Sequence, residues 1–328
     1  MFGIPRWWLS VSTAAVLMVG QIVMLSWTGE LLRQSNFQSM DGCPNEPPIT
    51  IVYSGPTNNA LPQATQYAEN TNFFIDHGLP CGHPCADHVR VVFVLTADSL
   101  NDYRDQITTL NDTTCNGRIE IMMREDRCYD MESARVAISH LTILPHERFL
   151  FVNCGMLGPV TSSSSDDYWA NKFSRMITDE VKLSGVSLNC GGKLGVSLPH
   201  IQSMLWCTDG IGLKAIMRSG AIYDCGNQLN ETDGRSKLIN RYELGLSKAI
   251  MQGGNNTNNT LGWKIQSIIE NRTFNWSDVP TAKCDDQWHD PSLIEKYSPD
   301  ELVFWKVTRI HQQRARQKIL NMTNPNPD

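Results

Sequence analysis

The most apolar segment of the chain lies near its N-terminal end. Residues 7–27 carry no charged side chain, and a tryptophan stands at each end of the run. An α-helix of this length extends about 31 Å, which is enough to cross the hydrocarbon core of a bilayer. A signal peptide has a shorter apolar region and ends in small residues, whereas this run ends Leu25-Ser26-Trp27. The pattern therefore predicts a transmembrane anchor, with a cleaved signal peptide or a buried helix as the alternatives.

Charges around this run predict the orientation of the anchor. Residues 1–6 hold Arg6 and the terminal amine, whereas Glu30 follows the run on its far side. Cytosolic flanks of membrane helices are enriched in Lys and Arg, so residues 1–6 are expected to form a cytosolic tail. Residues 28–48 are polar with little periodicity and are expected to form a stem. We therefore predict a single-pass type II protein whose remaining residues lie in the secretory lumen or outside the cell.

After residue 48, short apolar runs alternate with stretches of helical spacing. The predicted strands cover residues 49–53, 89–95, 119–122, 149–152 and 181–188, and the predicted helices cover 129–144, 168–177 and 211–218. Apolar strands that alternate with helices are typical of an α/β fold, with a mostly parallel sheet and helices on both faces. We expect one such domain over residues 49–320 and a disordered tail over 321–328. Ligands of such sheets bind outside the carboxyl ends of the strands.

Composition and modification signals narrow the partners and the compartment. The net charge is −6 and no basic stripe is interleaved with aromatic side chains, which argues against nucleic acid as a partner. All ten cysteines follow the predicted anchor, so they can form disulfides in an oxidising compartment. The sequence also contains seven Asn-x-Ser/Thr sequons, which predict N-glycosylation at Asn111, Asn230, Asn255, Asn258, Asn271, Asn275 and Asn321.

Some of the cysteines have a second interpretation. Cys81 and Cys85 have two histidines nearby, His83 and His88, and these are residue types that bind zinc. A closed zinc site needs further ligands, and no second pair is evident in the sequence. Three other cysteines lie in apolar runs, where a buried free thiol fits as well as a disulfide: Cys154, Cys190 and Cys207.

One predicted strand runs directly into a polar turn that contains glycine, in the segment RFLFVNCGMLGP at 148–159. Such a turn either presents side chains to a ligand or is an ordinary connection. Further segments accompany it in a fixed order: REDRCYD at 124–130, VKLSGV at 181–186, PHIQSM at 199–204, TDGIGL at 208–213, YELGLS at 242–247 and SPDELVFWKVTR at 298–309. As an ordered set, these segments resemble glycosyltransferases related to rhamnan-synthesis protein F, over roughly residues 49–310.

The resemblance implies a nucleotide-sugar transferase of the GT-A type, with a Rossmann-like sheet that holds donor and acceptor in one domain. Asp130 would correspond to the family's acidic position, Asn153 to the polar residue that ends the central strand, and Gly158 to the glycine of its Gly-Pro pair. We therefore expect these three residues to bind the donor. The chain departs from the family pattern at three positions. Asp126 stands where the family usually has Asn, Cys128 where it has Gly, and Cys154 where it has Asp or Ser.

The charge of the donor diphosphate can be neutralised by a metal or by basic side chains. Many GT-A enzymes hold Mn²⁺ or Mg²⁺ with an Asp-x-Asp motif, but this sequence has none; Asp130 and Glu132 have that spacing at the start of a predicted helix. A divalent metal therefore stays an open possibility. Without one, Lys306 and Arg309 are the candidate cations, because they follow an apolar run and could face a cleft. Alternatively, they belong to a solvated basic face that continues through Arg314, Arg316 and Lys318.

Three side chains in the resembling segments are candidates for catalysis. An inverting transfer needs a carboxylate or a histidine to accept the proton of the acceptor hydroxyl group, and His200, Asp209 and Glu243 are of these types. Each also has a structural interpretation. A histidine before a helix is often buried, Asp209 can cap the helix that starts near residue 211, and Glu243 can be a surface residue of a helix.

The sequence therefore predicts a Golgi or other secretory-pathway enzyme that transfers a sugar from a nucleotide-sugar donor to a glycan acceptor. The alternatives are a non-catalytic, membrane-anchored glycan-binding protein with a degenerate transferase domain, and another lumenal group-transfer enzyme such as a sulfotransferase. The latter needs a lysine-containing phosphosulfate loop early in the domain, and residues 49–60 contain no lysine.

Overall fold

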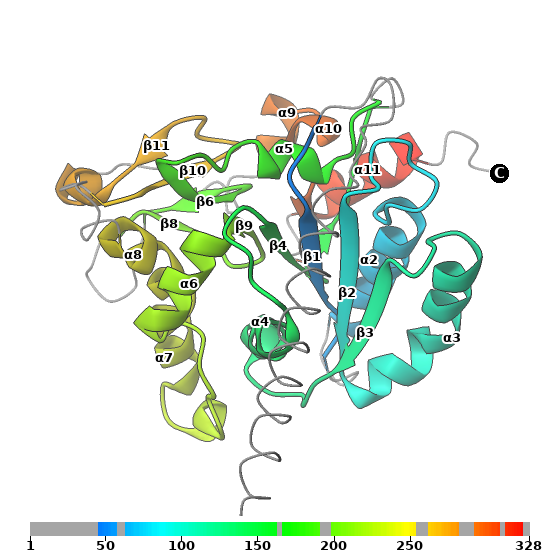
Figure 1. Cartoon of the computed structure of the whole chain (residues 1–328), viewed down its shortest axis with the longest axis horizontal. Helices are drawn as coiled ribbons and strands as arrows, with labels where there is room; N and C mark the ends of the chain where they lie inside the picture. The colour runs from blue at the N-terminus through cyan, green and yellow to red at the C-terminus, as the bar shows by residue number, and fades with distance from the viewer. Residues whose placement is uncertain are drawn as a thin grey trace, which may run out of the picture. The chain divides into compact units, whose positions relative to one another are not determined.

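The computed structural model describes residues 45–57, 63–162, 166–190, 198–253, 262–281, 292–308 and 312–323 (Figure 1). The chain forms two compact units, Met1–Asn45 and Glu46–Asp328, and almost all described residues belong to the second. The predicted anchor over 7–27 and most of the predicted stem lie outside the described residues. No helix within the described ranges is both long and apolar enough to cross a membrane.

The second unit is organised around one sheet of eight strands. Their order across the sheet is β11 (Thr273–Phe274), β10 (Lys264–Ser267), β6 (Val181–Gly185), β9 (Leu205–Asp209), β4 (Arg148–Asn153), β1 (Ile49–Ser54), β2 (Val89–Leu95) and β3 (Ile119–Met123). Strand β9 is antiparallel to both of its neighbours and β11 is antiparallel to β10, whereas the other pairs are parallel. Six of the eight strands therefore run in one direction, which confirms the expected mostly parallel α/β sheet.

Helices cover both faces of this sheet (Figure 1). On one face lie α2 (Ala64–His77), α3 (Ala97–Thr113), α5 (Ala170–Ser174) and α11 (Gln313–Thr323), and on the other α4 (Tyr129–His140), α6 (Gly210–Ser219), α7 (Gly234–Arg241) and α8 (Glu243–Gly253). Successive side chains of a strand point to opposite faces, so β1 places Ile51 and Tyr53 in the first core and Val52 in the second. Both faces are buried, which explains why the central strands are apolar almost throughout.

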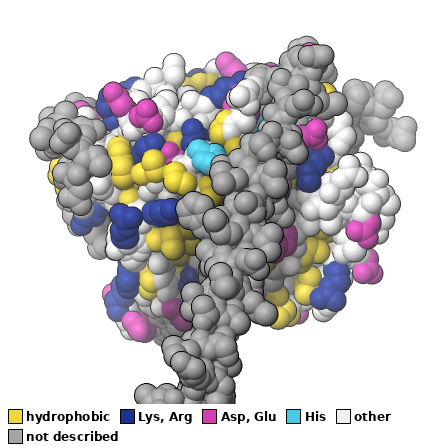
Figure 2. All heavy atoms as spheres, viewed as in Figure 1, with side chains coloured by type: hydrophobic (Ala, Val, Ile, Leu, Met, Phe, Trp, Pro, Cys, Tyr) yellow, Lys and Arg dark blue, Asp and Glu magenta, His cyan; other side chains and the backbone are white. Residues whose placement is uncertain are grey.

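Smaller elements complete this unit. Two short antiparallel pairs join β5 (Met156–Leu157) to β12 (Trp305–Lys306) and β7 (Leu188–Asn189) to β8 (His200–Ile201). The remaining short helices are η1 (Gln228–Asn230), η3 (Trp276–Thr281), α9 (Leu293–Lys296) and α10 (Pro299–Leu302). Where α6, α7 and α8 lie, hydrophobic and basic side chains are interspersed at the surface (Figure 2), and Ile211, Met217 and Ile239 of α6 and α7 are exposed.

The first four predicted strands are observed in the structure. The strands predicted at 49–53, 89–95, 119–122 and 149–152 correspond to β1, β2, β3 and β4. The run at 181–188 is divided between β6 and β7, and the helix predicted over 129–144 ends at His140 because Leu141 adopts an extended conformation, with Pro145 following. Of the helix predicted over 168–177, only Ala170–Ser174 is α-helical. Strand β9 was not predicted.

The cysteines form disulfides in the described part of the chain. Cys81 is bonded to Cys115 and Cys128 to Cys225, which excludes Cys81 as a zinc ligand. Cys85 and Cys190 are also disulfide-bonded, whereas Cys154 and Cys207 are free and buried. The free-thiol alternative therefore holds for Cys154 and Cys207 but not for Cys190.

Five of the seven sequon asparagines lie in the described residues. Asn230, Asn271 and Asn321 are exposed, and Asn275 is half-buried. Asn111, also half-buried, accepts a hydrogen bond from the Ile119 backbone N–H through Oδ1 at 2.8 Å. The two remaining sequons, at Asn255 and Asn258, lie outside the described residues, and glycosylation stays a prediction at all seven.

Candidate functional site

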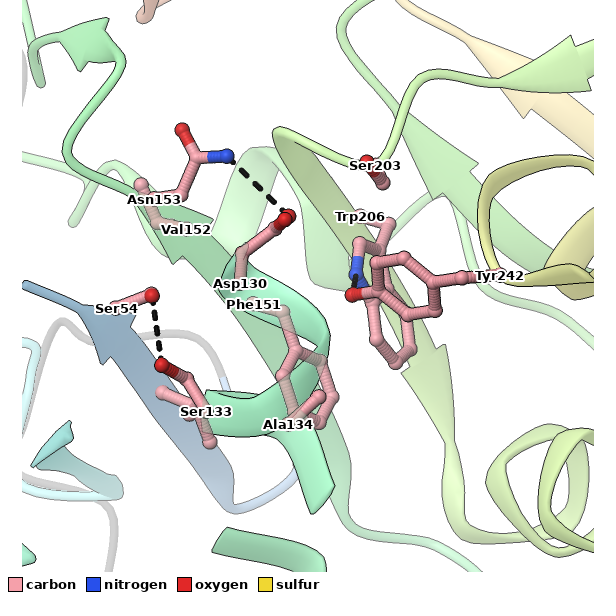
Figure 3. A pocket seen from close by; sticks show the side chains of 11 residues that line it. Ser54, Asp130, Ser133, Ala134, Phe151, Val152, Asn153, Ser203, Trp206 and Tyr242 are labelled. Atoms are coloured by element: carbon pink, nitrogen blue, oxygen red, sulfur yellow. Dashed lines mark hydrogen bonds between the residues drawn. The ribbon is translucent and has the colours of Figure 1, made fainter. Parts of the chain in front are cut away.

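The strand order places a cavity at the carboxyl ends of β1 and β4. From β1 the chain moves outward to β2 and β3 and then returns to β4 on the other side of β1, so the two strands flank a topological switch point. Open α/β sheets bind ligands at such points. Ser54 and Asn153 end the two strands and are partners in the register. The cavity (Figure 3) is lined by Val52, Ser54, Asp130, Ser133, Ala134, Phe151, Val152, Asn153, Ser203, Trp206 and Tyr242.

Asp130 lines this cavity directly after a sharp turn at Cys128 and Tyr129. Cys128 and Tyr129 have φ angles of 56° and 52°, and a left-handed backbone is uncommon for residues other than glycine. The disulfide to Cys225 holds Cys128 in place, so the start of α4 is attached to the segment between α6 and α7. Asp130 lies in the first turn of α4 and faces the end of β4 (Figure 3).

Asp130 and Asn153 contact each other directly. The Asn153 amide donates a hydrogen bond from Nδ2 to Oδ2 of Asp130 at 3.2 Å, and its Oδ1 accepts one from the Gly155 backbone N–H at 3.0 Å. The second bond fixes which end of the amide faces the carboxyl group. Burial raises the pKa of Asp130 to about 6; the bond from Asn153 opposes this shift, and the charge of Glu243 adds to it. The structure thus brings together two of the residues predicted to bind the donor.

Glu243 and His200 lie beside this pair. Glu243 begins α8, and its Oε1 is 3.6 Å from Nε2 of His200, while the Ser203 hydroxyl group donates to its Oε2 at 3.4 Å. Nδ1 of His200 is 2.8 Å from the Leu198 carbonyl oxygen, which assigns the ring proton to Nδ1 in the neutral imidazole. The His200 ring is buried, whereas 22% of the Glu243 side chain is exposed. Two of the three predicted catalytic residues therefore join Asp130 in one cluster.

Asp209 lies at the opposite edge of the sheet from this cluster. Strand β9 runs antiparallel to β4, so Asp209 pairs with Arg148 at the beginning of β4, far from Asn153 at its end. Its Oδ1 accepts the Gly212 backbone N–H at 2.8 Å, and its Oδ2 is 2.6 Å from the Lys182 ammonium group. Asp209 thus has the helix-capping role that the sequence analysis gave as the alternative to catalysis, and it is not part of the site.

Of the two C-terminal candidates, Lys306 lies next to the turn that follows Asn153. Lys306 of β12 pairs with Met156 of β5, so its backbone lies beside the site. A Cβ atom on Gly158 would stand 2.5 Å from the Val303 carbonyl oxygen, and the φ angle of this glycine is 153°. Close packing therefore accounts for Gly158 without a ligand. Arg309 lies outside the described residues.

The predicted basic face is not uniformly solvated. Arg316 is only 7% exposed, donates to Oδ1 of Asn70 at 2.9 Å and forms an ion pair with Glu69. These contacts attach α11 to α2, so Arg316 has a structural role.

Asp130 and Glu132 do not act as a pair. Glu132 is buried and accepts hydrogen bonds from Arg135 at 2.7 Å and from Arg127 at 3.3 Å, whereas Asp130 faces Asn153. Across the described ranges, no group of three His, Cys, Asp or Glu side chains is placed to hold a metal ion. Asp130 and Glu132 thus face different partners.

Sequence reasoning missed three residues of this region. Ser203 and Tyr242 line the cavity, and the Tyr242 hydroxyl oxygen accepts a hydrogen bond from Nε1 of Trp206 at 3.3 Å (Figure 3). Arg124 directly follows β3 and is buried. A basic residue directly after an apolar strand was the available signal for Arg124, but the sequence does not distinguish it from a solvated arginine.

The chain was compared with protein-family models, curated proteins and solved structures. No protein-family model matches it, and no curated protein matches it. Two solved structures of the glycosyltransferase GlyE from Streptococcus pneumoniae TIGR4 are similar at TM-scores of 0.33 and 0.31, with 8% and 11% identity, covering 60% of this chain and 43% of theirs. The inositol-1-phosphate CTP transferase from T. maritima is similar at a TM-score of 0.26, with 14% identity, covering 51% of this chain and 73% of that one. This chain thus spans less than half the length of the GlyE chains.

Proposed function

We propose that this chain is a glycosyltransferase that moves a sugar from a nucleotide-sugar donor to a glycan acceptor. The observation that carries the proposal is the convergence of Asp130, Asn153, Glu243 and His200 at the switch point of the sheet. These side chains come from segments that are far apart in the sequence, and they combine two carboxyl groups with an amide and an imidazole. The ordered series of segments that resembles rhamnan-synthesis protein F-like enzymes supports the same activity.

Asp130 is the carboxyl group best suited to act as the general base. With a pKa of about 6, it is mostly ionised at neutral pH and remains more basic than an ordinary aspartate. In the proposed step the acceptor hydroxyl oxygen bonds to the anomeric carbon, and its proton passes to Asp130. The bond from that carbon to the donor phosphate oxygen breaks, and the nucleoside diphosphate leaves with the electron pair.

Glu243 is placed to bind and orient the acceptor. Its carboxyl group is partly exposed, and Ser203 and His200 hold it from two sides. A carboxylate held in this way accepts hydrogen bonds from sugar hydroxyl groups and lowers the entropy lost on reaching the reactive geometry. Glu243 is also the alternative base, and variants of the two carboxyl groups distinguish the roles.

We further propose that the enzyme is a type II membrane protein with its catalytic domain in the lumen of the Golgi or another secretory compartment. The apolar run at 7–27 supports the anchor. The disulfides Cys81–Cys115 and Cys128–Cys225 support an oxidising compartment, as do the seven sequons.

Nucleotide release by the full-length chain tests the activity. The purified protein is offered UDP-, GDP- and dTDP-sugars with a mixture of glycan acceptors, once with Mn²⁺ and once with EDTA. We expect release from one donor class, and we expect Asp130→Asn to lower kcat by about 10²–10⁴-fold. Glu243→Gln should mainly raise KM for the acceptor.

A matched control for charge removal is Glu180→Gln, because Glu180 is an exposed partner of Lys264 and should leave turnover unchanged. If a folded protein releases no nucleotide from any donor, the non-catalytic glycan-binding alternative replaces this proposal. If Asp130→Asn keeps full activity and Glu243→Gln loses kcat, Glu243 is the base.

A further inference from the structure

Arg124 is a buried cation whose hydrogen-bonding groups are not all used. It directly follows β3, and its backbone N–H donates to the Leu95 carbonyl oxygen at 2.8 Å, which fixes it at the carboxyl ends of β2 and β3. Only 5% of the residue is exposed. One terminal nitrogen, Nη1, donates to the Glu125 carbonyl oxygen at 3.0 Å, but Nε and Nη2 are buried and have no hydrogen-bond partner among the described residues. Buried donors left unsatisfied are unfavourable and rare in native proteins.

The carboxyl groups near Arg124 do not fill these donors. The guanidinium group interacts electrostatically with three carboxyl groups, most strongly with that of Asp126 and less strongly with those of Asp130 and Glu132. Glu132 already accepts hydrogen bonds from Arg127 and Arg135, and Asp130 accepts one from Asn153. The surrounding acidic residues therefore balance part of the charge of Arg124 while its Nε and Nη2 stay unsatisfied.

Arg124 lies near the proposed catalytic cluster and also lines an open groove. Arg124 interacts electrostatically with Asp130 and with the thiol of Cys154, which follows Asn153, so the guanidinium group is near the switch point. It also lines a groove of about 520 Å³ beside the start of α3 and the first two turns of α4. The charged side chains that line this groove are the basic Arg124 and Arg135 and the acidic Asp98, Glu125, Asp126 and Glu132.

We infer that Arg124 binds the diphosphate of the nucleotide-sugar donor through Nε and Nη2. These two nitrogens lie on one edge of a guanidinium group and match two oxygens of one phosphate, the bidentate geometry for which arginine is suited. The inference rests on the proposed glycosyl transfer and gives Arg124 the role that sequence reasoning considered for Lys306 and Arg309. When the bond to the anomeric carbon breaks, negative charge grows on the leaving diphosphate, and a buried guanidinium group stabilises it.

Binding of inorganic pyrophosphate to the full-length chain tests this inference without requiring turnover. Affinity is measured by titration calorimetry, and stability by thermal unfolding with and without pyrophosphate. Arg124→Met should weaken pyrophosphate binding by at least about tenfold, because hydrogen bonds to a charged group are lost. Without ligand, the same variant should be as stable as the parent or more stable, because it removes unsatisfied buried donors. Arg124→Lys, which keeps the charge but lacks the paired donors, should bind pyrophosphate with intermediate affinity.

Arg148 supplies the matched control. Its buried Nε likewise has no hydrogen-bond partner in the described part of the chain, but Arg148 begins β4 at the opposite edge of the sheet. Arg148→Met should therefore leave the affinity for pyrophosphate unchanged. Equal losses in the Arg124 and Arg148 variants would mean that the effect is general and would overturn the inference. So would unchanged binding in both Arg124→Met and Arg124→Lys, or no pyrophosphate binding by the parent protein.

The two proposals fail in distinguishable ways. If pyrophosphate binding depends on Arg124 but no nucleotide sugar is turned over, the anion site stands and glycosyl transfer is wrong. If the parent protein and Arg124→Met release nucleotide with the same kcat and KM, glycosyl transfer stands and the role of Arg124 is wrong.

Discussion

The amide of Asn153 donates to the carboxyl group of Asp130 at 3.2 Å and so joins the end of β4 to the first turn of α4. Because Gly155 holds the other end of the amide, the carboxyl group has a hydrogen-bond donor in a fixed position. Burial nevertheless raises the pKa of Asp130 to about 6, so the desolvation of the carboxylate outweighs this bond. The pKa of Asp130 is thus set mainly by burial, which raises it, and by the bond from Asn153, which lowers it.

Replacing Asn153 should move the pH dependence of activity. Its hydrogen bond favours the ionised form of Asp130, so Asn153→Ala should raise the pKa of Asp130 above its present value of about 6. The acid limb of kcat/KM should then shift to higher pH, with less change at alkaline pH. Ser133→Ala is the control, because Ser133 lines the same cavity but bonds to Ser54. An acid limb that stays in place in Asn153→Ala would contradict the assignment of Asp130 as the base.

Asp130 should make the folded protein less stable at neutral than at acidic pH. Its pKa is about 6 in the folded state against an ordinary 3.8, so between these values the folded state binds more protons than the unfolded state. The contribution of Asp130 to stability falls as pH rises from about 4 to 6, by up to about 3 kcal/mol, and is then constant. Asp130→Asn should lack this fall. Urea unfolding of the parent and of Asp130→Asn at pH 4 and pH 7 measures this difference in the free energy of unfolding. If Asp130→Asn is no more stable than the parent at pH 7, the raised pKa is refuted.

Asp209→Asn should have the opposite effect on stability. Asp209 pairs with Lys182, and both side chains are about 95% buried, so the variant leaves an ammonium group without its carboxylate. Breaking a buried ion pair in this way typically destabilises a protein by about 3–5 kcal/mol. Turnover per folded molecule should be unchanged, because Asp209 lies at the far edge of the sheet. A fall in kcat with unchanged stability would restore Asp209 as a catalytic candidate.

The disulfide between Cys128 and Cys225 should matter for both stability and donor binding. It joins positions 97 residues apart, and substitution of both cysteines by serine should destabilise the protein by about 2–5 kcal/mol. The start of α4 then loses its attachment, so donor affinity should fall even at temperatures where the protein remains folded. Replacing Cys81 and Cys115, which are 34 residues apart and do not flank Asp130, should lower stability without weakening donor binding. Equal donor affinities in the two double variants would contradict a positioning role for Cys128–Cys225.

The local pattern of residues was sufficient to predict the central strands and one residue of the site. The run at 89–95 is apolar and rich in valine except for Arg90, and it forms β2 with the predicted bounds. A strand that is buried on both faces is apolar along most of its length. Asn153 was also accessible to sequence reasoning, since it is the first polar residue after the apolar part of β4 and therefore lies at the carboxyl edge.

The tertiary structure decided the direction of β9 and the partners of the charged side chains. Leu205–Asp209 is short and ends in polar residues, so nothing local predicts that it inserts antiparallel between β4 and β6 and carries Asp209 to the edge away from the site. The sequence does not distinguish the roles of its charged side chains. In the structure Asp209 caps a helix, Glu243 lies near Asp130, and Arg124 is buried with unsatisfied donors. A charged side chain takes its role from its neighbours in space, because the energy of burying a charge depends on the partners that the fold brings to it.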